Sequence, residues 1–156
     1  MNNTCYDLLL EAILMCNVLE DQLSFPLYAC SREAIKRYRP FLEALGLTYT
    51  QYIMLLAIWE EGFISVRDLG RKLYLDSGTL TPVLKHLEQV GFITRRRWEK
   101  DERVLIVTIT DEGLELRARA QELSGLIPAA PMSAEEAAQL QLLLDRFLQG
   151  MEDTAD

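Results

Sequence analysis

The segment from Leu73 to Ile109 constrains the fold more than any other part of this chain. It reads LYLDSGTLTPVLKHLEQVGFITRRRWEKDERVLIVTI, and its first half repeats apolar residues at helical spacing until Gly91, which fits the end of a helix. Two β-like runs follow, over residues 92–98 and 103–109, and the polar tip EKDE separates them. The segment therefore predicts a helix that leads directly into a charged β-hairpin.

The start of this helix is open between two alternatives. Asp76 or Ser77 would cap it early, whereas Thr81 would place Pro82 at the first helical position, which Pro favours. The apolar face is the same in both cases and consists of Leu80, Val83, Leu84, Leu87 and Val90.

Further helices are expected on both sides. The apolar spacing predicts helices over about 4–20 and 22–45, with Pro26 in the first turn of the second and a kink or break at Pro40. Capping residues mark the later starts, because their side chains satisfy free backbone N–H groups. The expected caps are Thr48 with Gln51, Ser65, and Ser133 with Glu136. The run TDEG over residues 110–113 is expected to open a helix that reaches about residue 123, and Ser133 one that reaches about residue 150.

Ser65 would open a short helix over about residues 66–73, and a tight connection joins it to the helix that ends at Gly91. Two helices joined in this way and followed by a hairpin make a winged helix-turn-helix. We therefore predict a mainly α fold with a small β-hairpin, in a single domain over residues 1–156. Residues 48–110 would form the winged-helix core. Residues 1–47 and 111–150 would supply dimerisation helices, because their apolar stripes exceed what the small core needs and invite pairing with a second copy.

Charge is distributed unevenly along the chain. The net charge is −8, yet nine basic and six acidic residues lie between Arg67 and Arg103, which gives this region +3 and leaves −11 for the remainder. A local basic surface is what binding to nucleic-acid phosphates requires. The distribution therefore indicates double-stranded DNA as a partner, with a winged-helix protein-interaction module as the alternative.

The helix and the hairpin each supply candidate DNA contacts. An exposed helix N-terminus in the major groove reaches base edges and phosphates through small polar residues. The candidates on the helix are Ser77, Gly78, Thr79, Thr81, Lys85 and His86, and those on the hairpin are Arg95, Arg97 and Arg103. Arg103 follows the turn, where it is placed to enter a narrow minor groove. Asp101 is expected to orient its guanidinium by a charge-assisted bond.

The chain resembles the MarR family of bacterial repressors, and within that family the organic-peroxide sensors of the OhrR-like branch. The resemblance lies in LEDQLSFPLYACSREAIKRYRPFLEALGLTYTQYIMLLAIWEE, LYLDSGTLTPVLKHLEQVGFITRRR and DERVLIVTITDEG, and it covers about residues 19–113. It implies a homodimer that binds a near-palindromic operator with two winged helices. It also implies repression of a nearby peroxide-detoxification gene.

That branch senses peroxide with a cysteine in a motif similar to L-C-F-x-L-Y. Here the motif is LSFPLY over residues 23–28, so Ser24 occupies the reactive position. A hydroxyl group is not readily deprotonated near neutral pH and forms no sulfenic acid, so the peroxide chemistry is lost at this position. The tyrosines that surround the thiolate in that branch match Tyr28, Tyr38 and Tyr49.

Three explanations for Ser24 remain open. It is a deliberate substitution that keeps the protein in its DNA-binding form, or a natural change in a regulator that lost peroxide sensing or took a small-molecule effector. Alternatively, organic hydroperoxide sensing moved to Cys16 or Cys30. The spacing places Cys30 on a different helix face from Ser24, whereas Cys16 would share that face on a continuous helix.

Other classes of function find little support in the sequence. The three cysteines, Cys5, Cys16 and Cys30, show neither metal-ligand spacing nor a disulfide framework. The chain contains no paired-carboxylate, Ser-His-Asp, metal or phosphate-loop arrangement, so we expect neither an enzyme nor a cofactor. We also expect no membrane association and a cytoplasmic location, because neither a signal peptide nor an apolar run of about 20 residues is present.

Overall fold

The computed structural model describes residues 19, 22–127, 129 and 131–153. Cys5, Cys16 and nearly all of the helix expected over residues 4–20 lie outside the described residues. The described part is mainly helical with a small antiparallel sheet, which confirms the predicted fold class.

Proline residues divide the first described helical region. Helix α2 (Ser24–Arg37) carries Pro26 in its first turn, and α3 (Arg39–Leu45) carries Pro40 at its start. The two helices are separate at Tyr38, so the predicted interruption at Pro40 is confirmed. The expected beginning of this region near Gln22 lies two residues too early. Gly46 ends α3 in the left-handed conformation at φ 70°.

A helix, a very short strand and a second helix come next. Helix α4 (Tyr49–Glu61) begins with the predicted capping box, since Thr48 Oγ1 accepts from the Gln51 backbone N–H and the Gln51 side chain accepts from that of Thr48. Strand β1 (Phe63–Ser65) was not predicted from the sequence, where only a connection was expected. Helix α5 (Val66–Leu73) begins after its predicted cap, Ser65.

The structure resolves the alternative starts of helix α6 (Ser77–Gln89). The carboxylate of Asp76 accepts a hydrogen bond from the Thr79 backbone N–H at 3.0 Å, which makes Asp76 the cap. The alternative start at Thr81 is therefore wrong, and Pro82 lies inside the helix. The C-cap is Val90 rather than the predicted Gly91, which follows it in the left-handed conformation at φ 85°.

The wing is formed by strands β2 (Ile93–Trp98) and β3 (Asp101–Ile109). β3 lies in the middle of the sheet, antiparallel to both neighbours, in the order β1-β3-β2. β3 begins two residues earlier than predicted, so Glu99 and Lys100 alone connect the wing strands. The pairing is irregular near the tip, between Arg97 and Trp98.

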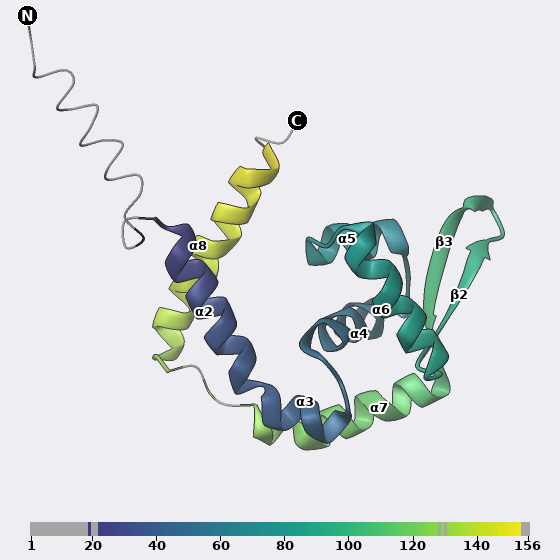
Figure 1. Ribbon diagram of the computed structural model, residues 1–156, viewed down its shortest axis with the longest axis horizontal. Coiled ribbons are helices and arrows are strands. Elements are labelled where there is room, and N and C mark those ends of the chain that lie inside the picture. Colours follow the sequence, from purple (N-terminus) through teal and green to yellow (C-terminus); the bar gives the residue numbers. More distant parts are fainter. Residues whose placement is uncertain (1–18, 20–21, 128, 130, 154–156) are drawn as a thin grey trace, which may run out of the picture.

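The C-terminal part contains α7 (Asp111–Glu122), the 3₁₀ helix η2 (Leu123–Leu126) and α8 (Ala134–Asp153). Helix α7 begins in the run that was predicted to open it, and Thr110 caps it by accepting from the Gly113 backbone N–H. The predicted capping box of α8 is confirmed, since Ser133 and Glu136 hydrogen-bond reciprocally. In Figure 1, α2 and α8 lie to one side of the molecule, and α4, α5, α6 and the wing lie to the other.

The hydrophobic core lies on the winged-helix side of the molecule. Its largest fully buried side chains come from α3, α4, α5, α6 and the sheet, namely Phe41, Met54, Leu55, Ile58, Leu69, Leu84, Leu87, Ile93 and Val107. Helix α2 buries none of its residues in this chain. Among the described residues, no single helix is long and apolar enough to cross a membrane; α3 and α4 meet that test only as a pair, bent by 72°.

Candidate nucleic-acid interface

Helix α6 turns its apolar side toward the core and its polar side outward. Leu80, Leu84 and Leu87 are buried. The outward side exposes five of the six residues predicted to contact DNA from this helix, which are Ser77, Gly78, Thr81, Lys85 and His86. The 3.6-residue period of the sequence accounts for this division.

Two of the predicted hydroxyl donors serve the helix itself. Thr79 is half-buried, and its Oγ1 donates to the Asp76 carboxylate at 3.1 Å. Thr81 Oγ1 donates to the Ser77 carbonyl oxygen at 2.7 Å. The hydrogen bonds from Thr79, led by its backbone N–H, hold the pKa of Asp76 below its usual range. The carboxylate is therefore charged at the positive end of the helix dipole, where it stabilises the first turn.

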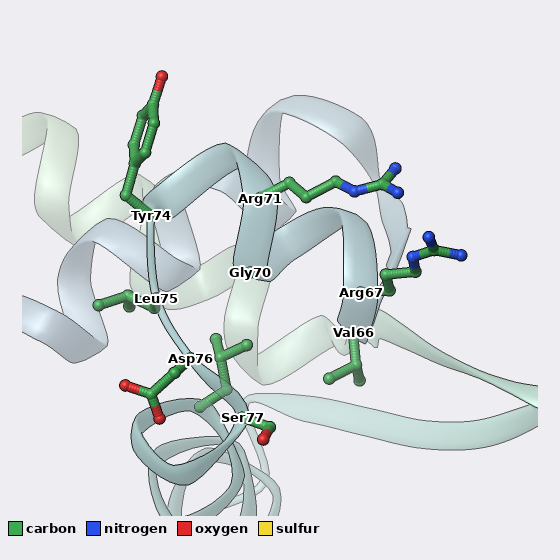
Figure 2. A pocket seen from close by; sticks show the side chains of 9 residues that line it. Val66, Arg67, Gly70, Arg71, Tyr74, Leu75, Asp76 and Ser77 are labelled. Atoms are coloured by element: carbon green, nitrogen blue, oxygen red, sulfur yellow. The ribbon is translucent and has the colours of Figure 1, made fainter. Parts of the chain in front are cut away.

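An open cleft of about 730 Å³ is lined by α5, the connection after it and the start of α6, as Figure 2 shows. Gly70 permits the two helices to approach closely, because a Cβ there would lie 2.9 Å from both the Leu75 carbonyl oxygen and Leu80 Cδ1. Arg67 and Arg71 extend outward from α5 beside this cleft (Figure 2). Neither arginine was predicted as a site residue, although the local excess of basic residues included both.

At the tip of the wing, a carboxylate holds an arginine side chain in place. Arg103 Nε and its backbone N–H donate to Asp101 Oδ1 at 3.1 and 3.0 Å, and Nη2 donates to Oδ2 at 3.3 Å. These bonds hold the pKa of Asp101 below its usual range. The Arg103 side chain is nevertheless 90% exposed, so the predicted pairing orients a guanidinium that points into solvent. Arg97 supports the same loop by donating to the Arg103 carbonyl oxygen at 3.3 Å.

Arg95 has a different environment from Arg97 and Arg103. Its side chain is only 18% exposed, and its Nε and Nη2 donate to Glu88 Oε2 on helix α6 at 3.1 and 2.6 Å. The same bonds hold the pKa of Glu88 below its usual range. Of the three arginines predicted on the hairpin, Arg95 is thus directed into the protein.

A feature of the wing that was not predicted is Trp98, which is 42% exposed beside the turn. Lys100 places its ammonium 5.8 Å from the centre of the Trp98 ring. Trp98 lines a second cleft of about 730 Å³, together with Phe63, Arg67, Asp101 and Arg103. An aromatic residue beside a hairpin turn would have been the signal in the sequence.

The four residues of the expected sensing pocket do not meet within one chain. Tyr38 and Tyr49 pack edge to face with ring centres 5.5 Å apart, and burial, with a smaller effect of Tyr38, raises the pKa of Tyr49. Ser24 begins the 14-residue helix α2 and Tyr38 follows its end, so about 20 Å of helix separates them. Tyr28 is exposed, and its hydroxyl group accepts a hydrogen bond from Arg32 at 2.9 Å.

Cys30 is exposed and free on α2. Within the part of the chain that the structure describes, no three His, Cys, Asp or Glu side chains form a group that could hold a metal ion.

A helix with a polar outward face, packed next to a hairpin that presents an oriented arginine, defines a winged-helix DNA-binding protein. Comparison with known proteins supports this class. The model of the transcriptional regulator SarA/Rot family matches residues 36–119. The organic hydroperoxide resistance transcriptional regulator of Bacillus subtilis is 46% identical over 132 residues, which cover 84% of this chain and 90% of that protein.

Two further comparisons agree. The HTH-type transcriptional regulator SarZ of Staphylococcus saprophyticus is 41% identical over 133 residues, or 85% of this chain and 91% of SarZ. The structure of reduced AbfR bound to DNA superposes with a TM-score of 0.75 at 35% identity, covering 88% of this chain and 95% of AbfR. The chain belongs to the SarA/Rot family of transcriptional regulators and is an OhrR-like regulator of the MarR type.

Proposed function

We propose that this protein is a homodimeric repressor that binds a near-palindromic DNA operator, in the cytoplasm and without enzymatic activity. One observation carries the proposal: α6 exposes its polar side next to a wing whose Arg103 is oriented by Asp101 yet 90% exposed. In this arrangement α6 enters the major groove and Arg103 reaches the adjacent minor groove. Arg67 and Arg71 of α5 supply contacts to the flanking phosphates.

The dimer is supported by the apolar side chains of the two helices that lie away from the core. Large hydrophobic residues are exposed along both helices, namely Leu23 at the N-cap of α2, Phe25, Tyr28 and Ile35 on α2, and Leu140, Leu142, Leu143, Phe147 and Met151 on α8. Monomeric proteins rarely leave an apolar surface of this extent open to water. A second copy would cover these helices and leave both winged helices facing one side, as two operator half-sites require.

We propose that the protein does not sense organic peroxide through Ser24. Cumene hydroperoxide should leave the protein on its operator, because a serine hydroxyl group offers no sulfenic acid state. A second candidate function is release by a small-molecule effector, and the half-buried rings of Tyr38 and Tyr49, whose centres lie 5.5 Å apart, are the aromatic surface against which such an effector would bind.

A mobility assay with duplex DNA at fixed salt tests these proposals. The wild-type protein should bind an operator-containing duplex, and Arg103→Ala should weaken binding by roughly 1–3 kcal/mol if Arg103 reaches a base edge. Failure of the wild-type protein to bind any duplex selected from its own genome would exclude the DNA-binding function. Unchanged binding by Arg103→Ala would instead remove the wing from the interface.

The same assay separates the explanations for Ser24. Peroxide should release Ser24→Cys from DNA but not the wild-type protein, if Ser24 alone has silenced the switch. Release of the wild-type protein that disappears in Cys16→Ser or Cys30→Ser would show that sensing has moved to that cysteine.

A further inference from the structure

The contact between Glu88 and Arg95 joins the last turn of helix α6 to the first strand of the wing. Both oxygens of Glu88 are used: Oε1 accepts from the Arg95 backbone N–H at 3.1 Å, and Oε2 accepts from Nε and Nη2 at 3.1 and 2.6 Å. The side chains are 37% and 18% exposed, so this ion pair is less open to solvent than the pair at the wing tip. Hydrogen bonds between charged partners in such a setting are strong and directional.

The base of the wing is already held by backbone contacts. The Phe92 backbone N–H donates to the Leu87 carbonyl oxygen at 3.0 Å, and the Thr110 hydroxyl group donates to the Gly91 carbonyl oxygen at 2.6 Å. The hairpin projects away from α6 toward its tip (Figure 1). Beyond Arg95, the side chains of Arg96, Arg97 and Trp98 are exposed. Arg95 is therefore placed where a side-chain contact determines the angle at which the free part of the wing leaves the helix.

We propose that Glu88 is a positioning residue for DNA recognition, which holds Arg95 and thereby sets the wing relative to α6 so that both reach their grooves together. Arg95 acts inside the protein and not as a phosphate contact. The inference rests on the proposed DNA-binding function. It assigns a role to Glu88, an acidic residue on the recognition helix whose charge by itself opposes binding to DNA.

The alternative role for Arg95 carries a clear electrostatic disadvantage. To bind a phosphate, the guanidinium would have to leave Glu88, which would then be an unpaired carboxylate beside a polyanion. Breaking a partly buried pair in this way leaves an uncompensated charge and repels DNA. The two residues therefore favour DNA binding as a pair, although Glu88 alone would oppose it.

This reasoning predicts the sign of a substitution. Glu88→Gln removes one negative charge near the DNA, which by electrostatics alone should strengthen binding. We expect the opposite, about fivefold weaker operator binding, because the amide cannot accept the same charge-assisted bonds. The matched control is Glu99→Gln at the wing turn, since Glu99 is exposed and its side chain forms no hydrogen bond or ion pair within the described part of the chain. It removes the same charge and should bind equally well or more tightly.

Two readouts distinguish positioning from a general loss of stability. Hydroxyl-radical footprinting of Glu88→Gln should show lost protection in the minor groove under the wing, with protection beside α6 retained and the melting temperature of the protein nearly unchanged. Uniform loss of protection, or binding as strong as that of Glu99→Gln, would overturn the proposal. Absence of operator binding by the wild-type protein would refute the proposed function itself, which keeps the two failures apart.

Arg95→Gln completes the test. If Arg95 acts only through Glu88, the double variant Glu88→Gln/Arg95→Gln should bind no more weakly than the weaker single variant. Both single variants should also show the same dependence of affinity on salt. The slope of log binding constant against log salt concentration measures the number of phosphate contacts. If this slope were smaller in magnitude by about 0.9 for Arg95→Gln than for Glu88→Gln, Arg95 would contact a phosphate directly and the inference would be refuted.

Discussion

Gly113 lies where the wing, α4 and α7 meet, and a single methyl group there should disturb all three. A Cβ at this position would lie 2.3 Å from the Phe92 carbonyl oxygen and 2.4 Å from Ile109 Cδ1. The Gly113 carbonyl oxygen also accepts a hydrogen bond from the Trp59 indole Nε1 at 3.0 Å, in a buried position. The clash cannot be relieved by a flexible side chain alone, because the Phe92 oxygen belongs to the backbone at the base of the wing.

The expected cost of Gly113→Ala follows from these contacts. Forcing an extra carbon into a closely packed site typically costs about 1–3 kcal/mol. Displacement of α7 would also weaken the indole hydrogen bond, whose net contribution is about 0.5–1.5 kcal/mol. We therefore expect the free energy of unfolding to fall by about 2–4 kcal/mol. Operator affinity should fall as well, since Phe92 and Ile109 belong to the base of the hairpin that carries Arg103.

Urea unfolding followed by circular dichroism measures this loss, at one protein concentration because dimerisation contributes to stability. Gly125→Ala is the matched control: an added Cβ there meets no atom within 4 Å. That variant should remain within about 0.5 kcal/mol of the wild-type protein. A Gly113→Ala protein as stable as Gly125→Ala would refute the packing described at this junction.

Two further predictions concern the core and the pH dependence of stability. Leu84→Ala truncates a side chain on the buried side of α6 that is only 1% exposed. The free energy of unfolding, measured by heat or urea, should therefore fall by about 2–5 kcal/mol. Hydrogen bonds lower the pKa values of Asp76, Glu88, Asp101 and Glu136 in the folded protein. These carboxylates stabilise the folded protein fully above their ordinary pKa values of 3.8 for Asp and 4.5 for Glu, and the stabilisation is lost as pH falls through their lower pKa values in the folded protein. The free energy of unfolding, measured in urea at a series of pH values, should therefore decline on acidification.

The helices were predictable because their signals are local. A cap depends on residues within one turn, so Thr48, Ser65 and Ser133 could be identified from a few neighbouring residues. The buried and exposed sides of α6 followed from its period in the same way. Its start was ambiguous only because Asp76 and Thr81 both satisfy the local rules, and the hydrogen bond from Thr79 to Asp76 decides between them.

Features that depend on distant residues were not predictable. Phe63–Ser65 is too short to show an alternating pattern, and it is a strand because Thr108, Val107 and Ile106 of β3 lie beside it. The same limit applies to Arg95, which looks like its neighbours Arg96 and Arg97 in the sequence. Its role is set by Glu88, seven residues earlier on another element, and this partner becomes visible only when α6 and β2 are packed together.

The separation of Ser24 from the tyrosines links sensing to assembly. Ser24 and Tyr38 lie at opposite ends of α2, about 20 Å apart, and the rigid helix between them prevents one chain from closing a pocket around both. A pocket that contains Ser24, Tyr38 and Tyr49 therefore requires a second chain. Because α2 buries none of its own residues, its surface is available for that chain. It follows that substitutions weakening the proposed dimer should also abolish the peroxide response of Ser24→Cys, whereas a response by a monomer would show that these residues do not form one pocket.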